Sequence, residues 1–430
     1  MDNNLEVEKN GDNSPCSTKL IKFTFILFGI GSLLAWNTIL TELMFLDSYV
    51  KKIDLMKSAS FLNFAPNIIL QFILLWKKNL FKIEKQLIFG LIASIIMLIL
   101  IPLCAIIFQN QDILSLIITI ILFLIMGLIN ALCTSGFFAF TSFFPLEMII
   151  ALSTGQGIAG IFLNIIMYIL KPSIRVNDLK KKEIIEAIIF FSISVLILVV
   201  CLIFLIFSLK NQYFQYYLNK KESDKLDKIL DDNEEKSNEN QLIEGSTDYD
   251  IGISQQTSFY EMFKLLIDID LLCVFIYIVT FAMYPVAFQN QNIFNIGEYN
   301  FNTILTLYNF FDTLGRYLIS AVTPTKKLTF ISVLTRGALL VTIVLNYYFQ
   351  YNGFNLTFTS IFLIFNVSFL GLTNGVGTTL CFGIAPTLVN DELKGQAGAS
   401  VSFFTIVGIF TGSLFAFLTK VILNHIHEVN

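Results

Sequence analysis

The sequence predicts an all-α, polytopic membrane protein of about 11 transmembrane helices, with six before a central polar stretch and five after it. Two observations carry this prediction. Hydrophobic residues make up 55% of the 430 residues and charged residues only 14%, which lies far outside the usual composition of soluble domains. Apolar stretches of about 20 residues, the length that crosses a bilayer as a helix, recur almost from end to end and exclude a soluble domain with a single anchor.

The apolar stretches divide the chain into two helical halves. We expect spans near residues 22–44, 59–76, 87–108, 113–140, 148–170, 184–208, 271–288, 301–322, 329–349, 357–382 and 396–423. The chain then consists of an amino-terminal tail (1–21), a first half (22–208), a polar loop (209–265), a second half (266–423) and a carboxyl-terminal tail (424–430).

The orientation follows from lysines in the short connections. Lysines after the second, eighth and tenth spans lie on one side of the membrane, and this enrichment marks the cytoplasmic side, although Lys180, Lys181 and Lys182 argue for the opposite. We therefore expect the amino terminus and the large loop in the cytoplasm and the carboxyl terminus outside. The loop is rich in Lys, Asp, Glu, Asn and Ser, which predicts disorder. The plasma membrane is the expected location, with an internal membrane left open.

Several functions are disfavoured by what the sequence lacks. It contains no G-x-x-x-x-G-K-[ST] phosphate loop, no H-E-x-x-H and no G-x-S-x-G motif, so we expect neither ATP-driven transport nor an enzyme. The six cysteines and two histidines show no convincing metal-ligand spacing, so we expect no metal and no cofactor. The net charge of −4 provides no basic patch for a nucleic acid. The expected partners are a solute and the lipid bilayer, and nothing indicates an obligate protein partner.

The eighth span contains two charged residues, Asp312 and Arg316, which are four residues apart and therefore share one helix face. Each charge alone costs about 2.5–3.5 kcal/mol at the centre of a membrane helix. Leu305 and Asn309 precede them on the same stripe, which indicates a face turned toward the bundle interior. Two interpretations stay open: an ion pair that only locks helices together, or a carboxylate and a guanidinium that bind a polar solute in a cavity.

A second candidate region lies in the first span, where Leu33, Trp36 and Asn37 sit well inside the apolar run. Trp36 is either an anchor at the membrane interface or a buried stacking face with the amide of Asn37 beside it.

Small and polar residues in the fifth, tenth and eleventh spans predict close packing between helices. These residues are Gly155, Gln156, Gly157, Gly160, Asn374, Gly375, Gly408 and Gly412. The side chain of Gln156 is also able to form a hydrogen bond between helices.

Together these motifs resemble the equilibrative nucleoside transporter family. The segment from Asn309 to Arg316 looks like the family's Phe-Asp-x-x-Gly-Arg signature. The segment from Leu33 to Asn37 is similar to its first-span Leu-Leu-Pro-Trp-Asn, with Ala35 in place of the proline. Further likenesses lie at residues 145–160, 283–285, 373–375 and 397–398. One such match would be weak, but several in order along the chain are specific.

The resemblance implies a major-facilitator-like fold and facilitated diffusion of nucleosides, or in some members nucleobases, through a central cavity that opens alternately to either side. By the same resemblance, Asp312 and Arg316 hold the ribose hydroxyls or an equivalent polar edge. Trp36 packs against the base with Leu33 beside it, and Asn309 lines the site.

One departure from the family leaves the base preference open. Alignment on Pro145 puts Thr134 where many relatives carry a glutamine that hydrogen-bonds the base, and Asn130 where they carry glycine. Thr134 is shorter than glutamine, and Asn130 could substitute from one turn earlier. The alternatives to nucleoside transport are a secondary, proton-coupled carrier of another small polar metabolite and a non-transporting receptor or structural subunit.

Overall fold

The computed structural model describes residues 15–50, 55–77, 80–218, 248–283, 293–294, 296–297, 300–351 and 354–429, and throughout this part of the chain the regular elements are helices. The helices of the first half are α2 (Pro15–Thr41), α3 (Leu43–Tyr49), α4 (Leu55–Trp76), α5 (Ile83–Ile107), α6 (Asp112–Thr141), α7 (Leu146–Ser173) and α8 (Leu179–Leu209). Those of the second half are α10 (Asp248–Met283), α11 (Asn300–Leu318), α12 (Lys326–Leu334), α13 (Gly337–Tyr351), α14 (Leu356–Ile384) and α15 (Lys394–Val429), with 3₁₀ turns at Ile319–Ala321, Ala385–Leu388 and Asp391–Leu393.

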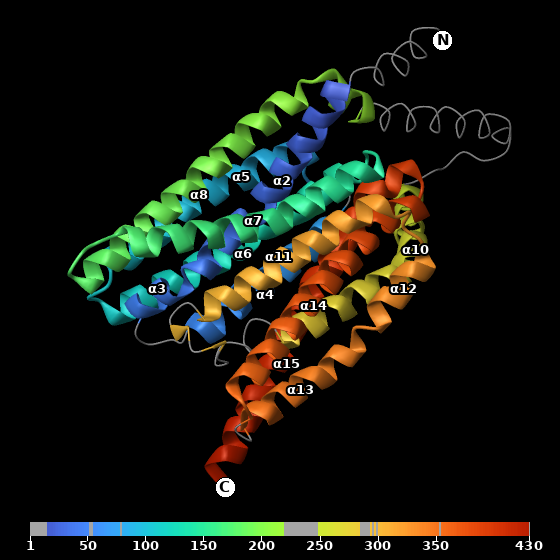
Figure 1. Ribbon diagram of the computed structural model, residues 1–430. Helices are drawn as coiled ribbons and strands as arrows, with labels where there is room; N and C mark the ends of the chain where they lie inside the picture. The colour runs from blue at the N-terminus through green and yellow to red at the C-terminus, as the bar shows by residue number, and fades with distance from the viewer. Residues whose placement is uncertain are drawn as a thin grey trace, which may run out of the picture.

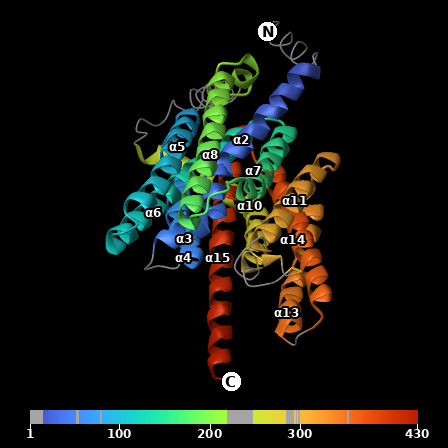
Figure 2. The same cartoon turned by 60° about the vertical axis from the view of Figure 1, so that its left-hand side comes forward.

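The helices form two groups that correspond to the two halves of the sequence (Figure 1). In the first group α2 packs against α7, and α4 and α5 pack against α6; in the second, α10 packs against α15 and α11 against α14. The groups meet where α7 contacts α11 and where α4 and α6 contact α15. The start of α2 and the end of α15 lie at opposite ends of the bundle (Figures 1 and 2).

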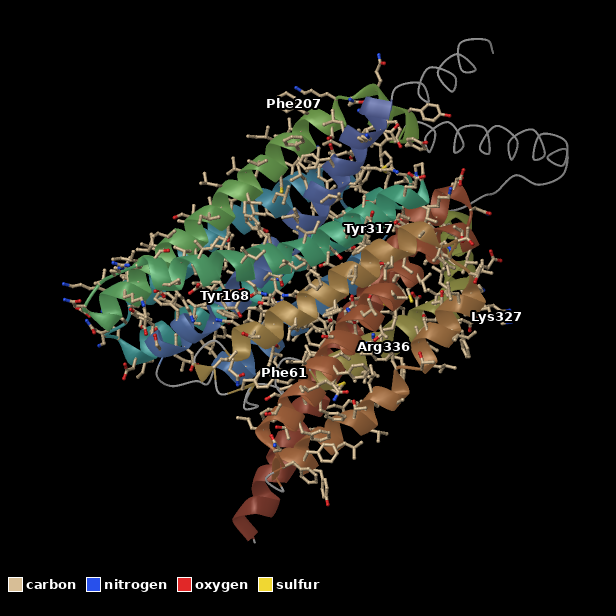
Figure 3. The ribbon with its side chains drawn as sticks, viewed as in Figure 1. Phe61, Tyr168, Phe207, Tyr317, Lys327 and Arg336 are labelled. Atoms are coloured by element: carbon tan, nitrogen blue, oxygen red, sulfur yellow. The ribbon has the colours of Figure 1, made fainter. Side chains whose placement is uncertain are left out.

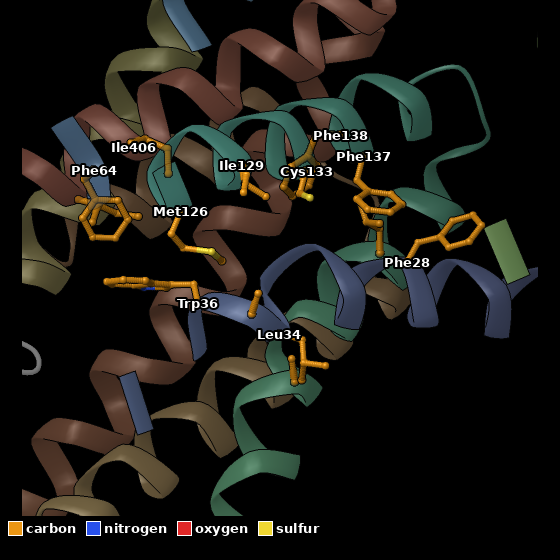
Figure 4. Close-up of a cluster of buried hydrophobic side chains, with 14 of the residues drawn as sticks. Phe28, Leu34, Trp36, Phe64, Met126, Ile129, Cys133, Phe137, Phe138 and Ile406 are labelled. Carbon is orange, nitrogen blue, oxygen red and sulfur yellow. The ribbon is translucent and has the colours of Figure 1, made fainter. Parts of the chain in front are cut away.

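Aromatic side chains fill the core of the first half. Phe25 and Phe28 of α2 pack against Phe140 of α6 with ring centroids 6.4 and 6.3 Å apart, and all three side chains are fully buried. The close-up of the cluster shows Phe28 beside Phe137, and their centroids are 5.6 Å apart (Figure 4). These contacts fix α2, which carries Trp36, to α6, which carries Thr134.

Glycines bring α11 and α14 into direct main-chain contact. A Cβ added at Gly375 of α14 would clash with the main-chain oxygen of Asp312, and one at Gly315 of α11 would clash with that of Leu372. Because only glycine fits at these two points, the Asp312 side chain is held next to the polar residues of α14.

Nine helices in the described part of the chain are long and apolar enough to cross a membrane, judged by length and composition alone. They are α2, α4, α5, α6, α7, α8, α10, α14 and α15. The all-α, multi-pass membrane fold therefore agrees with the prediction, whereas this criterion does not confirm the count of 11. Of the two other expected spans, α11 is short and rich in polar residues, and the ninth is divided between α12 and α13.

The span expected at 329–349 is not one continuous helix, because α12 ends at Leu334 and α13 begins at Gly337. Between them the backbone tightens into turns in which Arg336 N donates to Val333 O (3.1 Å) and Leu339 N donates to Arg336 O (2.9 Å). Such i→i−3 bonds narrow the helix locally. The break carries Arg336, whose side chain is fully buried.

Helix boundaries also extend into three segments that we expected to be non-helical. α2 begins at Pro15, α10 begins at Asp248 within the predicted loop 209–265, and α15 continues to Val429 through the predicted carboxyl-terminal tail. Hydropathy windows locate the apolar part of a helix and not its polar ends, so the helices are longer than the apolar stretches. Residues 1–14 and 219–247 of the predicted tail and loop lie outside the described residues.

Candidate functional site

A cavity of about 160 Å³ lies between the two halves of the bundle. From the first half it is lined by Leu33, Trp36, Asn37, Leu40, Thr41, Phe64, Asn67, Asn130, Thr134, Phe138, Gln156, Gly157, Gly160 and Asn164. From the second half it is lined by Tyr277, Phe281, Leu305, Tyr308, Asn309, Asp312, Arg316, Asn374, Phe382, Ser402, Thr405, Ile406 and Ile409. The structure thus brings together in one cavity all eight residues expected to bind solute: Leu33, Trp36, Asn37, Asn130, Thr134, Asn309, Asp312 and Arg316.

Asp312 and Arg316 form a buried ion pair on the wall contributed by α11. Arg316 Nε donates to Asp312 Oδ2 at 2.8 Å, and each residue is only 4% exposed. The second carboxylate oxygen, Oδ1, accepts from Asn374 Nδ2 of α14 at 2.7 Å. A carboxylate can accept about four hydrogen bonds, so this arrangement orients Asp312 and still leaves lone pairs available for a solute.

The guanidinium of Arg316 also connects the two halves. Its Nη1 donates to the hydroxyl of Ser153 (2.9 Å), to the Ser153 main-chain oxygen (3.2 Å) and to Gln156 Oε1 (3.3 Å), all on α7. Gln156 in turn donates to Ser32 Oγ of α2 at 3.0 Å. The ion pair is therefore part of a polar network that crosses the interface between the halves.

The opposite wall is aromatic. Trp36 is 6% exposed and lies edge-to-face with Phe64 of α4, with ring centroids 5.3 Å apart and an interplanar angle of 66° (Figure 4). Of the two interpretations of Trp36, the structure agrees with the buried stacking face, since the residue lines the cavity together with Leu33 and Asn37.

A cluster of amides and a hydroxyl lies on α4 and α6. Gln71 Nε2 donates to Asn67 Oδ1 (2.8 Å) and to Thr134 Oγ1 (3.1 Å), and Thr134 donates to the main-chain oxygen of Asn130 (2.7 Å). The amide of Asn130 donates to Asn63 Oδ1 at 2.9 Å. Gln71 was not predicted, because a single glutamine in an apolar span gives no signal of which helix it faces. It supplies an amide next to Thr134 from the neighbouring helix.

The glycines expected to mediate packing lie at close contacts between helices, whereas Gln156 and Asn374 of the same set lie at the cavity. Gly157 and Gly160 lie against Thr313 and Asn309 of α11, where a Cβ would come too close to their side chains. Gln156 and Asn374 line the cavity and hydrogen-bond to Arg316 and Asp312, respectively.

The remaining glycines of that set pack within one half. Gly155 lies against the main chain of Ile26 on α2, and Gly408 and Gly412 lie against Val274 and Ile278 on α10.

An aromatic pair narrows one end of the cavity. Phe138, near the end of α6, and Phe382, near the end of α14, stack with ring centroids 3.5 Å apart and an interplanar angle of 11°. Both line the cavity, which extends from this pair toward Thr41 at the last turn of α2. The pair joins the two halves at the end that carries the α6–α7 connection.

Sequence reasoning missed a further buried charged residue, Arg336, at the break between α12 and α13. It is fully buried, and its guanidinium donates to Thr280 Oγ1 (2.6 Å) and Thr373 Oγ1 (2.9 Å). The cost of a charge in a membrane helix applies to Arg336 as it does to Arg316. A charged residue within an apolar stretch was therefore enough to predict a buried site at Arg336. Unlike Arg316, it has no acidic residue four positions away that would have indicated an ion pair.

No group of three or more His, Cys, Asp or Glu residues that could hold a metal ion occurs among the residues described. The cavity instead offers a carboxylate, a guanidinium, several amides and an aromatic wall. This set of groups suits an uncharged solute with a polar edge and an aromatic ring.

Comparison with known proteins gives a consistent result. The family model described as nucleoside transporter matches residues 117–421. Equilibrative nucleotide transporter 7 of Arabidopsis thaliana is 24% identical over 405 residues, which cover 89% of this chain and 91% of the relative. Equilibrative nucleotide transporter 4 of the same plant is 26% identical over 293 residues, or 66% of each chain.

Solved structures with a similar fold belong to membrane carriers. A proton:xylose symporter of the major facilitator superfamily aligns with a TM-score of 0.61 at 12% identity, over 94% of this chain and 88% of that chain. A bacterial homologue of the iron transporter ferroportin, in an outward-facing state, aligns with a TM-score of 0.54 at 11% identity, over 93% of this chain and 98% of that chain. At such low identity the likeness shows the fold alone, which is that of the major facilitators.

Proposed function

Because this chain belongs to the nucleoside transporter family and is a multi-pass membrane transporter of nucleosides, we propose that a nucleoside or nucleobase binds in the central cavity between Asp312, Arg316 and Trp36. The observation that carries the proposal is that the eight residues expected from their chemistry or from the family resemblance to bind solute, on α2, α6 and α11, all line one cavity between the two halves. Such a position is where carriers with two helical bundles bind their solutes.

The polar wall suits the hydroxyl groups of a sugar. The free lone pairs of Asp312 accept hydrogen bonds from hydroxyls, and the guanidinium of Arg316 donates to their oxygens. Both residues are 4% exposed, so these charge-assisted bonds form with little competition from water. Each such bond contributes about 1.5–3 kcal/mol. Asn309 lines the cavity beside the pair, one turn before Asp312.

The aromatic wall suits the base. Trp36 provides an indole face, and stacking of a base on an aromatic side chain contributes about 1–3 kcal/mol. The amides and hydroxyl of Asn67, Asn130 and Thr134 line the same cavity and present donors and acceptors for the edge of the base. Thr134 alone is short, but Gln71 holds it and Asn67 in place through two hydrogen bonds.

We propose that transport proceeds by facilitated diffusion, with the cavity opening alternately to either side. To expose the cavity at its other end, the halves must rock apart at the Phe138–Phe382 stack, and Arg316 must release Ser153 and Gln156 on α7. With the lysine-rich connections in the cytoplasm, the aromatic pair is the inner closure, and the cavity extends toward the outside. In this orientation the amino terminus is cytoplasmic, the carboxyl terminus is extracellular and the protein resides in the plasma membrane.

Uptake of radiolabelled adenosine and hypoxanthine by transport-deficient cells that express the chain tests this function. We expect saturable uptake that is unchanged when the proton gradient is dissipated, and uptake at least tenfold weaker for Asp312→Asn at equal abundance in the membrane. Glu147→Gln is the control, because this acid lies at the exposed start of α7 and outside the cavity. No uptake of any purine or pyrimidine by the wild type would refute the function, and normal uptake by Asp312→Asn would refute the site.

A further inference from the structure

Arg336 is a fully buried cation in the second half of the bundle, at the break between α12 and α13 (Figure 3). Its recorded partners are neutral: Nη1 donates to Thr373 Oγ1 (2.9 Å) and to Leu370 O (3.5 Å), and Nη2 donates to Thr280 Oγ1 (2.6 Å) and to Ile276 O (3.3 Å). Its Nε has no hydrogen-bond partner in the described part of the chain. Packing alone does not explain a guanidinium here, because an apolar side chain would fill the same space without the cost of burying a charge.

A chain of three hydrogen bonds leads from Arg336 to the solute site. Arg336 Nη2 donates to Thr280 Oγ1 at 2.6 Å, Thr280 Oγ1 donates to Asn374 Oδ1 at 2.8 Å, and Asn374 Nδ2 donates to Asp312 Oδ1 at 2.7 Å. Arg336 and Thr280 are fully buried and do not line the cavity, whereas Asn374 and Asp312 do. The outer two residues therefore do not contact a solute in the cavity, and the hydrogen bonds connect them to it through the inner two.

The direction of these bonds shows what Arg336 contributes. The Thr280 hydroxyl has one proton and two acceptors within reach, Asn374 Oδ1 at 2.8 Å and Ile276 O at 2.9 Å. Arg336 donates to Ile276 O as well as to the Thr280 oxygen, which favours donation of the Thr280 proton to Asn374. This bond holds the oxygen of the Asn374 amide toward Thr280 and its NH₂ group toward Asp312. A flipped amide would point its oxygen at the carboxylate, and the two would repel.

We propose that Arg336 is a positioning residue for solute binding, which acts through Thr280 to fix the amide of Asn374 and thereby the carboxylate of Asp312. The proposal rests on the proposed function, in which Asp312 binds the solute. Arg336 then affects the affinity for the solute without contacting the solute itself.

Two threonine variants test the relay. Thr280 and Thr373 each carry a hydroxyl that accepts a hydrogen bond from Arg336, but only the Thr280 hydroxyl donates in turn to Asn374. For Thr280→Val we expect the KM of nucleoside uptake to rise about tenfold, equivalent to about 1.4 kcal/mol, with less than a twofold change in Vmax per transporter in the membrane. For Thr373→Val we expect a KM within twofold of the wild type. Equal effects of the two variants on KM would overturn the relay.

A double-mutant cycle supplies a readout that a purely structural role would not change. In the Asn374→Ala background the relay is already cut, so adding Thr280→Val is expected to raise KM by less than twofold. A full tenfold effect in that background would overturn the proposal. If Thr280→Val does not reach the membrane, Thr280→Cys serves instead: its thiol is a weaker donor and acceptor, so KM is expected to rise at least threefold, and an unchanged KM would count against the relay.

The outcome also separates this proposal from the proposed function. If Asp312→Asn weakens uptake and Thr280→Val behaves like Thr373→Val, the solute site stands and the relay falls. If Asp312→Asn transports normally, the solute site itself is wrong. Arg336→Lys keeps the charge and one donor toward Thr280, and we expect its KM to lie between those of the wild type and Arg336→Met.

Discussion

Trp36 offers the sharpest test of the aromatic wall, because the chain contains only two tryptophans. Trp36 lines the cavity and is 6% exposed, whereas Trp76 lies at the end of α4 and is 57% exposed. Replacing Trp36 with Leu removes a stacking surface for the base and keeps an apolar side chain. Stacking contributes about 1–3 kcal/mol per base, so we expect the Kd for a nucleoside to rise about tenfold.

The contact between Trp36 and Phe64 does not enter this estimate. The two rings are 5.3 Å apart in the free protein, and such a pair contributes about 0.5–1.5 kcal/mol to stability. If the pair persists when solute binds, its loss lowers the stability of the free and bound proteins alike and cancels in Kd. The expected tenfold change therefore reports the contact with the base.

Intrinsic fluorescence of the purified protein in lipid nanodiscs reports whether the solute binds beside Trp36, and the KM for uptake reports the loss of affinity in Trp36→Leu. In Trp76→Phe the only tryptophan is Trp36, and titration with a nucleoside is expected to quench its emission with the wild-type Kd. In Trp36→Leu the only tryptophan is Trp76, and the same titration is expected to leave the emission unchanged. Quenching in Trp36→Leu, or a KM for uptake equal to that of the wild type, would refute a role of Trp36 in binding the base.

Two further predictions concern the frame around the site. Gly375→Ala introduces a Cβ that clashes with the main-chain oxygen of Asp312, so we expect a loss of about 1–3 kcal/mol in stability, seen as a lower melting temperature in detergent. Gly337→Ala is the control, since its Cβ would meet only a side-chain atom at 3.8 Å, and an equal shift in both variants would contradict the reasoning. Gln71→Leu removes the amide that donates to Thr134, and we expect KM for nucleosides to rise about fivefold with unchanged abundance in the membrane; an unchanged KM would show that the amide cluster does not contact the base.

The position of the Asp312–Arg316 pair could be predicted from sequence for a simple reason. Two opposite charges four residues apart share one helix face, and in a membrane that face must meet protein or an aqueous cavity. The spacing thus fixed both the contact between the side chains and the direction in which they point. For Trp36 the sequence left two interpretations open, an anchor at the membrane interface and a buried stacking face, because the apolar run does not show what surrounds the ring.

The partners of this pair could not be predicted, because they come from other helices. Ser153, Gln156 and Asn374 reach Arg316 and Asp312 only through the arrangement of α7, α11 and α14. In the sequence their small neighbours indicated close packing, which is correct, but packing gives no information on which polar atom meets which. The hydrogen bonds depend on glycine contacts that bring α11 close to α7 and α14.

Arg336 shows a second limit of sequence reasoning. A window of about 20 residues averages the hydropathy of α12 and α13 into one span and conceals the break between them. The Arg336 guanidinium donates to the hydroxyls of Thr280 and Thr373. Threonine hydroxyls in membrane helices usually donate to a carbonyl oxygen in the preceding turn of their own helix. Thr373 does so here through Phe369 O, and the Thr280 hydroxyl also lies within reach of Ile276 O, so the second role of both threonines is visible only in three dimensions.

The polar network also indicates how binding and rocking are linked. In the free protein Arg316 Nη1 donates to Ser153 and Gln156 across the interface between the halves. Asp312 is held by Asn374, so the Arg316 guanidinium is the member of the pair that is free to change partners. A solute whose hydroxyl accepts from Arg316 competes for the same donor, so binding weakens a contact that keeps the halves in their present arrangement. The solute oxygen takes the place of the α7 acceptors, so the buried guanidinium of Arg316 keeps a hydrogen-bond partner when the solute binds. The equilibrium between the two conformations of the carrier shifts only by the difference in free energy between the bonds of Arg316 to α7 and its bonds to the solute. A small difference suits a carrier that must bind and release its solute on either side of the membrane.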